Sequence, residues 1–157
     1  MGRHGKGYDS NTFTRRIHPF KEEPAMSDKI QKPSSAFVAA SWVSLALGMG
    51  SYCLGLWNAQ MMLNEKGYYF VLLLYGLFAA VSLQKSVRDQ IDGIPVTGIY
   101  MGLAWVSTGA ALLLLAVGLW NATLTFSEKG FYGMAYILCL FSSVAIQKNI
   151  RDSANAG

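Results

Sequence analysis

Four long runs without a charged residue constrain the fold of this chain more than any other feature. They cover residues 37–56, 67–83, 100–119 and 130–146. As helices, the two longer runs would extend roughly 30 Å and the two shorter runs roughly 26 Å, close to the thickness of a bilayer's hydrocarbon core. A soluble helical bundle is the alternative, but its helices would each need a polar stripe, and these runs are apolar all round. We therefore predict an all-α polytopic membrane protein with four transmembrane helices.

The chain also repeats itself at an offset of 63 residues. The words Gly55-Leu56-Trp57-Asn58-Ala59 and Glu65-Lys66-Gly67 return as Gly118-Leu119-Trp120-Asn121-Ala122 and Glu128-Lys129-Gly130. Residues 37–89 lie over residues 100–152 without a gap, and 19 of these 53 pairs are identical. The sequence thus predicts two tandem two-helix repeats, residues 35–90 and 98–153, arranged as a pseudo-twofold bundle.

Residues 1–34 precede the first run and differ from it in character. They are polar and basic and show no apolar periodicity, so we expect a disordered tail. The segment lacks the apolar stretch and cleavage pattern of a signal peptide. Met26 is a plausible second start, which leaves open whether residues 1–25 belong to the mature chain.

The basic residues are distributed unevenly between the two sides of the predicted membrane helices. Seven of the 13 Lys and Arg lie in the first 34 residues, two in the loop between the repeats and two in the C-terminal tail, which leaves only Lys66 and Lys129 for the other two loops. The positive-inside rule then predicts that both termini are cytoplasmic. Because the charge follows membrane topology, the net charge of +4 does not indicate nucleic-acid binding.

The short outer loops hold the polar residues that recur in both repeats. Each loop is short enough to predict a tight antiparallel hairpin, with Asn64 and Ser127 as expected N-caps of the returning helices. Gly67 and Gly130 are expected to permit close packing where those helices enter the membrane. If the protein has a binding site, we expect it where equivalent polar groups of the two repeats meet at the outer face. That candidate cluster contains Asn58, Glu65, Lys66, Asn121, Glu128 and Lys129. Helix capping and interfacial anchoring are the competing interpretation.

Each repeat closes with Gln-Lys-x-x-Arg-Asp, at residues 84–89 and 147–152. Its cations lie at the cytoplasmic ends of the predicted helices, where they complement the helix dipole and can reach lipid headgroups. We predict four lipid-facing anchors, Lys85, Arg88, Lys148 and Arg151.

Small residues spaced four apart, and so on one face of a helix, predict close helix packing in lipid. Ala40, Ser44 and Gly48 form such a stripe on the first helix, and Gly76 with Ala80 forms one on the second.

The two cysteines, Cys53 and Cys139, are expected to be small packing residues rather than a disulfide or metal pair.

The chemistry of an enzyme is not visible in the sequence. There is no ordered Ser, His and Asp set, no phosphate-binding glycine loop and no metal-ligand spacing, and both histidines lie in the tail. We predict no catalytic residue, no metal and no cofactor.

The recurring Gly-Leu-Trp-Asn-Ala, Glu-Lys-Gly-x-Tyr and Gln-Lys-x-x-Arg-Asp motifs resemble those of the YiaA/YiaB family of bacterial inner-membrane proteins, which are built from a two-helix domain. The resemblance covers about residues 34–152, and it implies a bacterial inner-membrane protein with no assigned activity. We expect a structural or interaction protein whose partners are the lipid bilayer and a second copy or another membrane protein. A small transporter or channel with a site at the outer face is the alternative. It is weakened by the absence of an ionisable residue within the four runs and of an inverted repeat.

Overall fold

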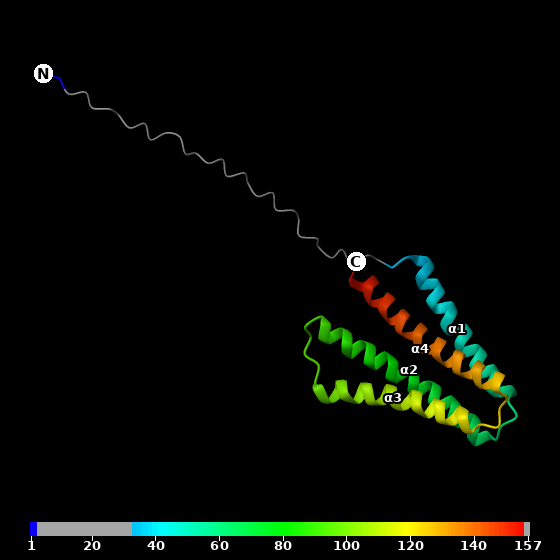
Figure 1. Cartoon of the computed structure of the whole chain (residues 1–157). Coiled ribbons are helices and arrows are strands. Elements are labelled where there is room, and N and C mark those ends of the chain that lie inside the picture. The colour runs from blue at the N-terminus through cyan, green and yellow to red at the C-terminus, as the bar shows by residue number, and fades with distance from the viewer. Residues whose placement is uncertain (3–32, 156–157) are drawn as a thin grey trace.

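The computed structural model describes residues 1–2 and 33–155, which contain four α-helices. They are α1 (Ser35–Asn58), α2 (Leu63–Ile91), α3 (Gly98–Asn121) and α4 (Phe126–Asn155) (Figure 1). Each contains one charge-free run, and all four are long and apolar enough to cross a membrane. The prediction of an all-α, four-helix membrane protein is confirmed. The predicted disorder of residues 1–34 falls almost entirely outside the described residues.

Local sequence explains where the helices begin and end. The Ser34 hydroxyl accepts a hydrogen bond from the Phe37 amide at 3.3 Å, which caps the start of α1. At the end of α2 the Gly93 amide donates to the Gln90 carbonyl and the Ile94 amide to the Asp89 carbonyl. This Schellman pattern needs a left-handed residue after the helix, and Gly93 supplies it with φ of 74°.

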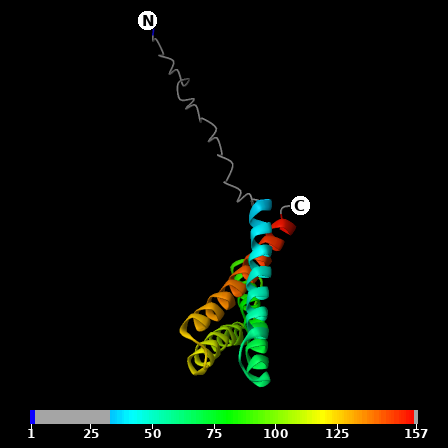
Figure 2. The ribbon, with the colours of Figure 1, turned by 90° about the vertical axis from the view of Figure 1, so that its right-hand side faces the viewer.

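The helices form a row in the order α1, α4, α2, α3 rather than two separate hairpins (Figure 1). Consecutive helices of one repeat touch little, and α1 makes no contact with α3 within residues 33–155. The prediction of a tight antiparallel hairpin in each repeat is therefore wrong: the loops are short, but the two helices that each loop connects do not pack along each other. The first helix of each repeat packs instead along the second helix of the other, and Figure 2 shows α4 inclined to α1 from a second direction.

Close approach of α1 to α4 has a specific cause in small residues on α1. A Cβ atom at Gly48 would lie 2.9 Å from Cys139 Sγ, and one at Gly55 would lie 2.9 Å from the Phe131 ring. Helices in lipid gain little from burying apolar surface against each other, so close backbone approach decides which pair associates. The buried stripe on α1 runs through Ser41 and Gly48, whereas Ala40 is exposed.

The pseudo-twofold relation exchanges α1 with α3 and α2 with α4. It turns the α1–α4 contact into the α3–α2 contact, and only the α2–α4 contact maps onto itself. The axis must then run between α2 and α4. Tyr69 and its repeat equivalent Tyr132 meet there with stacked rings, their centroids 6.4 Å apart.

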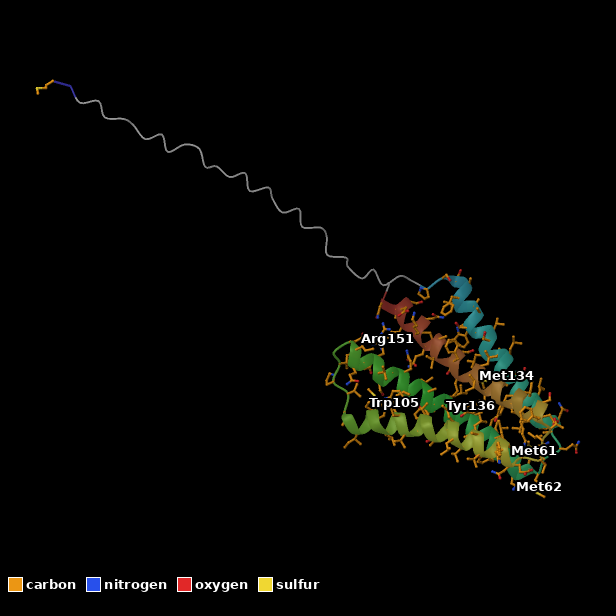
Figure 3. The ribbon with its side chains drawn as sticks, in the orientation of Figure 1. Met61, Met62, Trp105, Met134, Tyr136 and Arg151 are labelled. Atoms are coloured by element: carbon orange, nitrogen blue, oxygen red, sulfur yellow. The ribbon has the colours of Figure 1, made fainter. Side chains whose placement is uncertain are left out.

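Tyrosine hydroxyls tie the row together across three helix pairs. Tyr52 donates to the Tyr69 carbonyl at 3.0 Å, Tyr136 to the Leu72 carbonyl at 3.2 Å, and Tyr68 to the Leu114 carbonyl at 2.8 Å. Tyr136 lies about midway along the length of the helices (Figure 3). Such bonds contribute on average about 0.6 kcal/mol each in a membrane protein, so they orient the helices more than they stabilise them.

The helices run between two chemically different ends of the molecule, which we call the loop end and the termini end. The loop end carries the connections at residues 59–62 and 122–125, and the termini end carries the start of α1, the end of α4 and the connection between α2 and α3. In Figure 3, Met61 and Met62 mark the loop end and Arg151 the termini end. The predicted site residues divide between these ends.

Candidate functional sites at the two ends of the helix row

The glutamates at the loop end cap the helices that follow the loops. Glu65 Oε2 accepts from the Met62 amide at 2.9 Å, and Glu128 Oε2 accepts from both the amide and the hydroxyl of Thr125 at 2.8 Å. The Thr125 hydroxyl in turn accepts from the Glu128 amide at 3.3 Å, which completes a capping box. The caps are thus Met62 and Thr125, and the prediction of Asn64 and Ser127 is wrong.

The Thr125 contacts also act on the charge of Glu128. This carboxylate lies before the charge-free run 130–146, outside the membrane-spanning segment. Hydrogen bonds from the amide and then the hydroxyl of Thr125 lower the pKa of Glu128 below its ordinary value. Glu128 is consequently held ionised beside the positive end of the α4 dipole.

The lysines and asparagines at the loop end close the helices that precede the loops. Lys66 Nζ donates to the Trp57 carbonyl at 2.8 Å, and Lys129 Nζ donates to the Trp120 carbonyl at 3.1 Å. Asn58 and Asn121 each donate to the carbonyl four residues earlier, at 2.9 and 2.8 Å. These bonds supply donors to carbonyls that the ends of α1 and α3 leave without helical partners.

Two of the six predicted cluster residues meet across the repeat boundary. Glu65 at the start of α2 and Asn121 at the end of α3 line one cavity of about 330 Å³. Tyr68, Tyr69 and Gly118 form part of its wall. The other four predicted residues do not line this cavity. The six residues therefore do not all line one cavity, and Glu65 is the acidic group on the wall of this one.

At the termini end, the four predicted lipid anchors belong to a network of ion pairs. Lys85 and Lys148 each pair with the aspartate four residues later, Asp89 at 2.8 Å and Asp152 at 2.7 Å. Two further pairs cross between the repeats. The arginine of each repeat faces the closing aspartate of the other, Arg151 with Asp89 at 3.2 Å and Arg88 with Asp152 at 4.0 Å.

The sequence analysis did not assign a role to the aspartates of this network. Their side chains are only 12% and 11% exposed for Asp89 and Asp152. Asp89 lies beyond the charge-free run 67–83, and hydrogen bonds from Lys85 and then Arg151 lower its pKa. The available signal was that each aspartate closes a repeated motif four residues after a lysine, a helical ion-pair spacing.

The network is not symmetric, because Arg151 has a second acceptor that Arg88 lacks. Arg151 Nη2 donates to Asp92 Oδ2 in addition to Asp89. The repeat equivalent of Asp92 is Asn155, so no second carboxylate of the other repeat faces Arg88. Arg88 lies 3.6 Å from Asp92 and 4.0 Å from Asp152, too far for hydrogen bonds, and its Nε is buried without a partner in the described structure.

A buried polar pair near the same end was also missed from the sequence. Asn149 Nδ2 donates to Ser41 Oγ at 3.1 Å, and Asn149 is only 2% exposed. It links α4 to α1, and the equivalent of Asn149 in the first repeat is Ser86. The only sequence signal was that Asn149 is larger than Ser86, the polar residue at the equivalent position of the first repeat.

Two tandem, interlocked pairs of membrane-spanning helices with capped loops define the class of this protein as a polytopic α-helical membrane protein. The yiaA/B two helix domain matches the chain twice, at residues 37–89 and 100–152. The chain belongs to the YiaA/YiaB family, which confirms the resemblance found from its motifs.

Individual relatives extend this assignment. The chain is 56% identical over 128 residues to inner membrane protein YiaA of Escherichia coli strain K12, covering 82% of this chain and 88% of the relative. It is 28% identical over 96 residues to inner membrane protein YiaB of the same organism, covering 60% of this chain and 80% of that protein. An uncharacterized membrane protein of Bacillus subtilis strain 168, YubF, is 33% identical over 58 residues, 36% of this chain and 67% of its own length. No solved structure matches the chain.

Proposed function

We propose that the protein is a structural or interaction protein of the bacterial inner membrane without catalytic activity of its own. The observation that carries the proposal is that α1 and α3 form the two edges of the row and pack on one side only. The large apolar side chains that remain exposed on α3 include Leu103, Trp105 and Val106. Both Escherichia coli relatives are named inner membrane proteins, which supports the inner membrane as the location.

The outer face of α3 has room for another helix. Gly102 and Gly109 lie seven residues apart on α3, are exposed, and have no neighbouring atom within 4 Å of a Cβ built on them. Glycines that pack against nothing within the chain allow a second backbone to approach closely. A second copy of the chain, or a larger membrane protein, would cover this edge.

The membrane orientation forms part of the proposal. The 11 basic residues of the termini side against two on the loop side favour cytoplasmic termini. Reporter fusions after residue 155 and within residues 122–125 test this. A cytoplasmic signal from the loop fusion would reverse the orientation.

The interaction proposal is tested by purifying tagged protein from native membranes in mild detergent and measuring its mass and copurifying proteins. We expect a defined homo-oligomer or a stoichiometric partner. The double substitution Gly102→Leu and Gly109→Leu should abolish it while leaving helix content unchanged. Gly130→Leu, at an equally open glycine on α4, is the matched control. A monomer without partners would overturn the proposal.

A small transporter or channel is the second candidate, favoured by the cavity between Glu65 and Asn121 at the loop end. Flux into reconstituted vesicles tests it with two matched variants. Glu65→Gln removes a carboxylate that lines the cavity, whereas Glu128→Gln removes the equivalent helix-capping carboxylate outside it. Transport lost in the first variant and kept in the second would support this function, and equal loss would attribute the effect to capping.

A further inference from the structure

Arg88 is the arginine of the termini end whose hydrogen-bonding capacity is unused in the described structure. Its repeat equivalent Arg151 donates to two carboxylates, whereas Arg88 has only two carboxylates at ion-pair distance and a buried Nε without an acceptor. A guanidinium carries five N–H donors in a planar fork that matches phosphate and carboxylate oxygens. A guanidinium with unsatisfied donors is unfavourable in a partly buried place, and the Arg88 side chain keeps 34% of its surface exposed, so an additional acceptor can reach it and would bind favourably.

The charge balance around Arg88 points to an anionic acceptor. The ion-pair network contains four cations, Lys85, Arg88, Lys148 and Arg151, and three carboxylates, Asp89, Asp92 and Asp152. Four positive and three negative charges leave an excess of one positive charge. Asp92 has no acidic counterpart in the second repeat, because the equivalent position is Asn155. The excess positive charge therefore falls to Arg88, the arginine without hydrogen-bond acceptors.

Arg88 also lines an apolar groove between α2 and α3. The groove has a volume of about 400 Å³, within the range of roughly 300–1,000 Å³ typical of ligand sites. The rest of its lining is mostly apolar: Ala80, Leu83, Val87 and Ile91 of α2, Trp105 of α3 and Val144 of α4, beside the polar side chains of Gln84 and Thr108. Trp105 is 59% exposed and lies toward the same end of the row as Arg151 (Figure 3). The groove thus combines a cation with a lining suited to a hydrocarbon chain.

We propose that this groove is a binding site for one anionic phospholipid, with the phosphate at Arg88 and an acyl chain between α2 and α3. A free phosphate would satisfy Arg88 but would leave the apolar lining uncovered, and a neutral lipid chain would leave the excess charge unbalanced. Basic pockets between transmembrane helices bind anionic headgroups by this combination of contacts. The second repeat has no equivalent site, because Arg151 is already occupied by Asp89 and Asp92.

Trp105 provides a direct measurement of the acyl chain in the groove. The probe is phosphatidylglycerol with brominated acyl chains, and the comparison is phosphatidylcholine with the same chains. Both are mixed into reconstituted vesicles of the full-length protein in which Trp42, Trp57 and Trp120 are replaced by Phe. We expect stronger quenching of Trp105 fluorescence by the phosphatidylglycerol. Equal quenching by the two lipids would overturn the proposal.

Matched variants separate the headgroup contact from the groove. Arg88→Gln should lower the apparent preference for phosphatidylglycerol about tenfold or more, the loss expected for a hydrogen-bonded charge. Lys148→Gln removes the same charge outside the groove and should retain most of the preference, whereas Arg88→Lys keeps the charge without the planar fork and should retain only part of it. Val87→Phe fills the groove and should reduce quenching with the guanidinium intact. Preference kept in Arg88→Gln, or lost equally in Lys148→Gln, would refute a site at Arg88.

Free anions provide the last arm of the experiment. Excess inorganic phosphate at constant ionic strength should displace the brominated lipid weakly, because phosphate lacks the acyl chain. If inorganic phosphate alone removes the preference completely, Arg88 binds a soluble anion and the phospholipid assignment is wrong.

Discussion

The contact between α2 and α4 depends on the absence of a side chain at Gly76. A Cβ built there would lie 2.6 Å from Cζ of Tyr136, closer still to its hydroxyl oxygen, and 3.3 Å from Leu140 Cδ2. Tyr136 is fully buried, so its ring has no free space to enter. We predict that Gly76→Ala forces either the ring or the two helices to move apart.

The expected magnitude follows from two contributions. Overpacking a well-packed site is typically unfavourable by about 1 to 3 kcal/mol. Displacing the Tyr136 hydroxyl from the Leu72 carbonyl adds about 0.6 kcal/mol, the average for such bonds in a membrane. Part of this is offset by the better helix propensity of Ala, at most about 1 kcal/mol. The net loss should be about 2 kcal/mol.

The assay is reversible unfolding in mixed micelles, followed by circular dichroism or by the separation of labels on α2 and α4. Gly67→Ala is the matched control, because the structure has nothing within 4 Å of a Cβ at Gly67 although the sequence predicted close packing there. Combining Gly76→Ala with Tyr136→Leu, the residue type of the equivalent position Leu73, should be less damaging than the sum of the two changes. Equal stability of the Gly76 and Gly67 variants would refute the packing described for this contact.

Three further substitutions test the remaining contacts. Gly48→Ala places a Cβ 2.9 Å from a buried thiol on α4 and should destabilise the α1–α4 pair by about 1 kcal/mol in the same unfolding assay, whereas Gly50→Ala, at an open position, should not. Arg151→Gln removes one of the two cations that pair with Asp89 and the hydrogen-bond donor of Asp92, and it should lower the free energy of unfolding, with a smaller effect in high salt because the Asp92 side chain is 34% exposed. At Glu128 the folded-state pKa is lowered, so its contribution is present above the ordinary carboxyl pKa and is lost as the pH falls through the folded value. The hydrogen-exchange protection of the Thr125 amide should decrease on acidification in the native protein and be low at every pH in Glu128→Ala, which has no acceptor at this position; an unchanged amide in that variant would disprove the cap.

The candidate sites show where motif reasoning reached the chemistry and where it stopped. Repetition of Glu65 and Glu128 marked two groups with equivalent roles, and both accept hydrogen bonds from their own loops. Repetition did not reveal that Glu65 meets Asn121 in a cavity while Glu128 has no part in it. Local bonds follow from sequence spacing, whereas contacts across the repeats depend on how the helices pack.

The same distinction applies to the charged motifs at the termini end. Lys85 and Arg88 were recognised as cations at a helix end, and the helix does end at Ile91. Their partners across the repeat boundary were not predicted, because the reciprocal arginine and aspartate contacts exist only when α2 and α4 lie side by side. Arg88 lacks hydrogen bonds for two reasons: Asn155 stands where the first repeat has Asp92, and α2 packs beside α4. Only the first reason is visible in the sequence.

The sequence by itself determined the number of membrane helices, the twofold repeat and the division of charge between the two ends. Charge-free runs of bilayer length can be stable in lipid only as helices, since every backbone amide must find a partner within its own segment. Only the tertiary structure decided that α1 packs on α4 rather than on α2. Helices that are apolar all round carry no hydrophobic pattern to show which face is buried. The pairing therefore depends on shape, through glycines such as Gly48 and Gly76 that accept a neighbouring side chain, and shape is visible only once the helices are placed together.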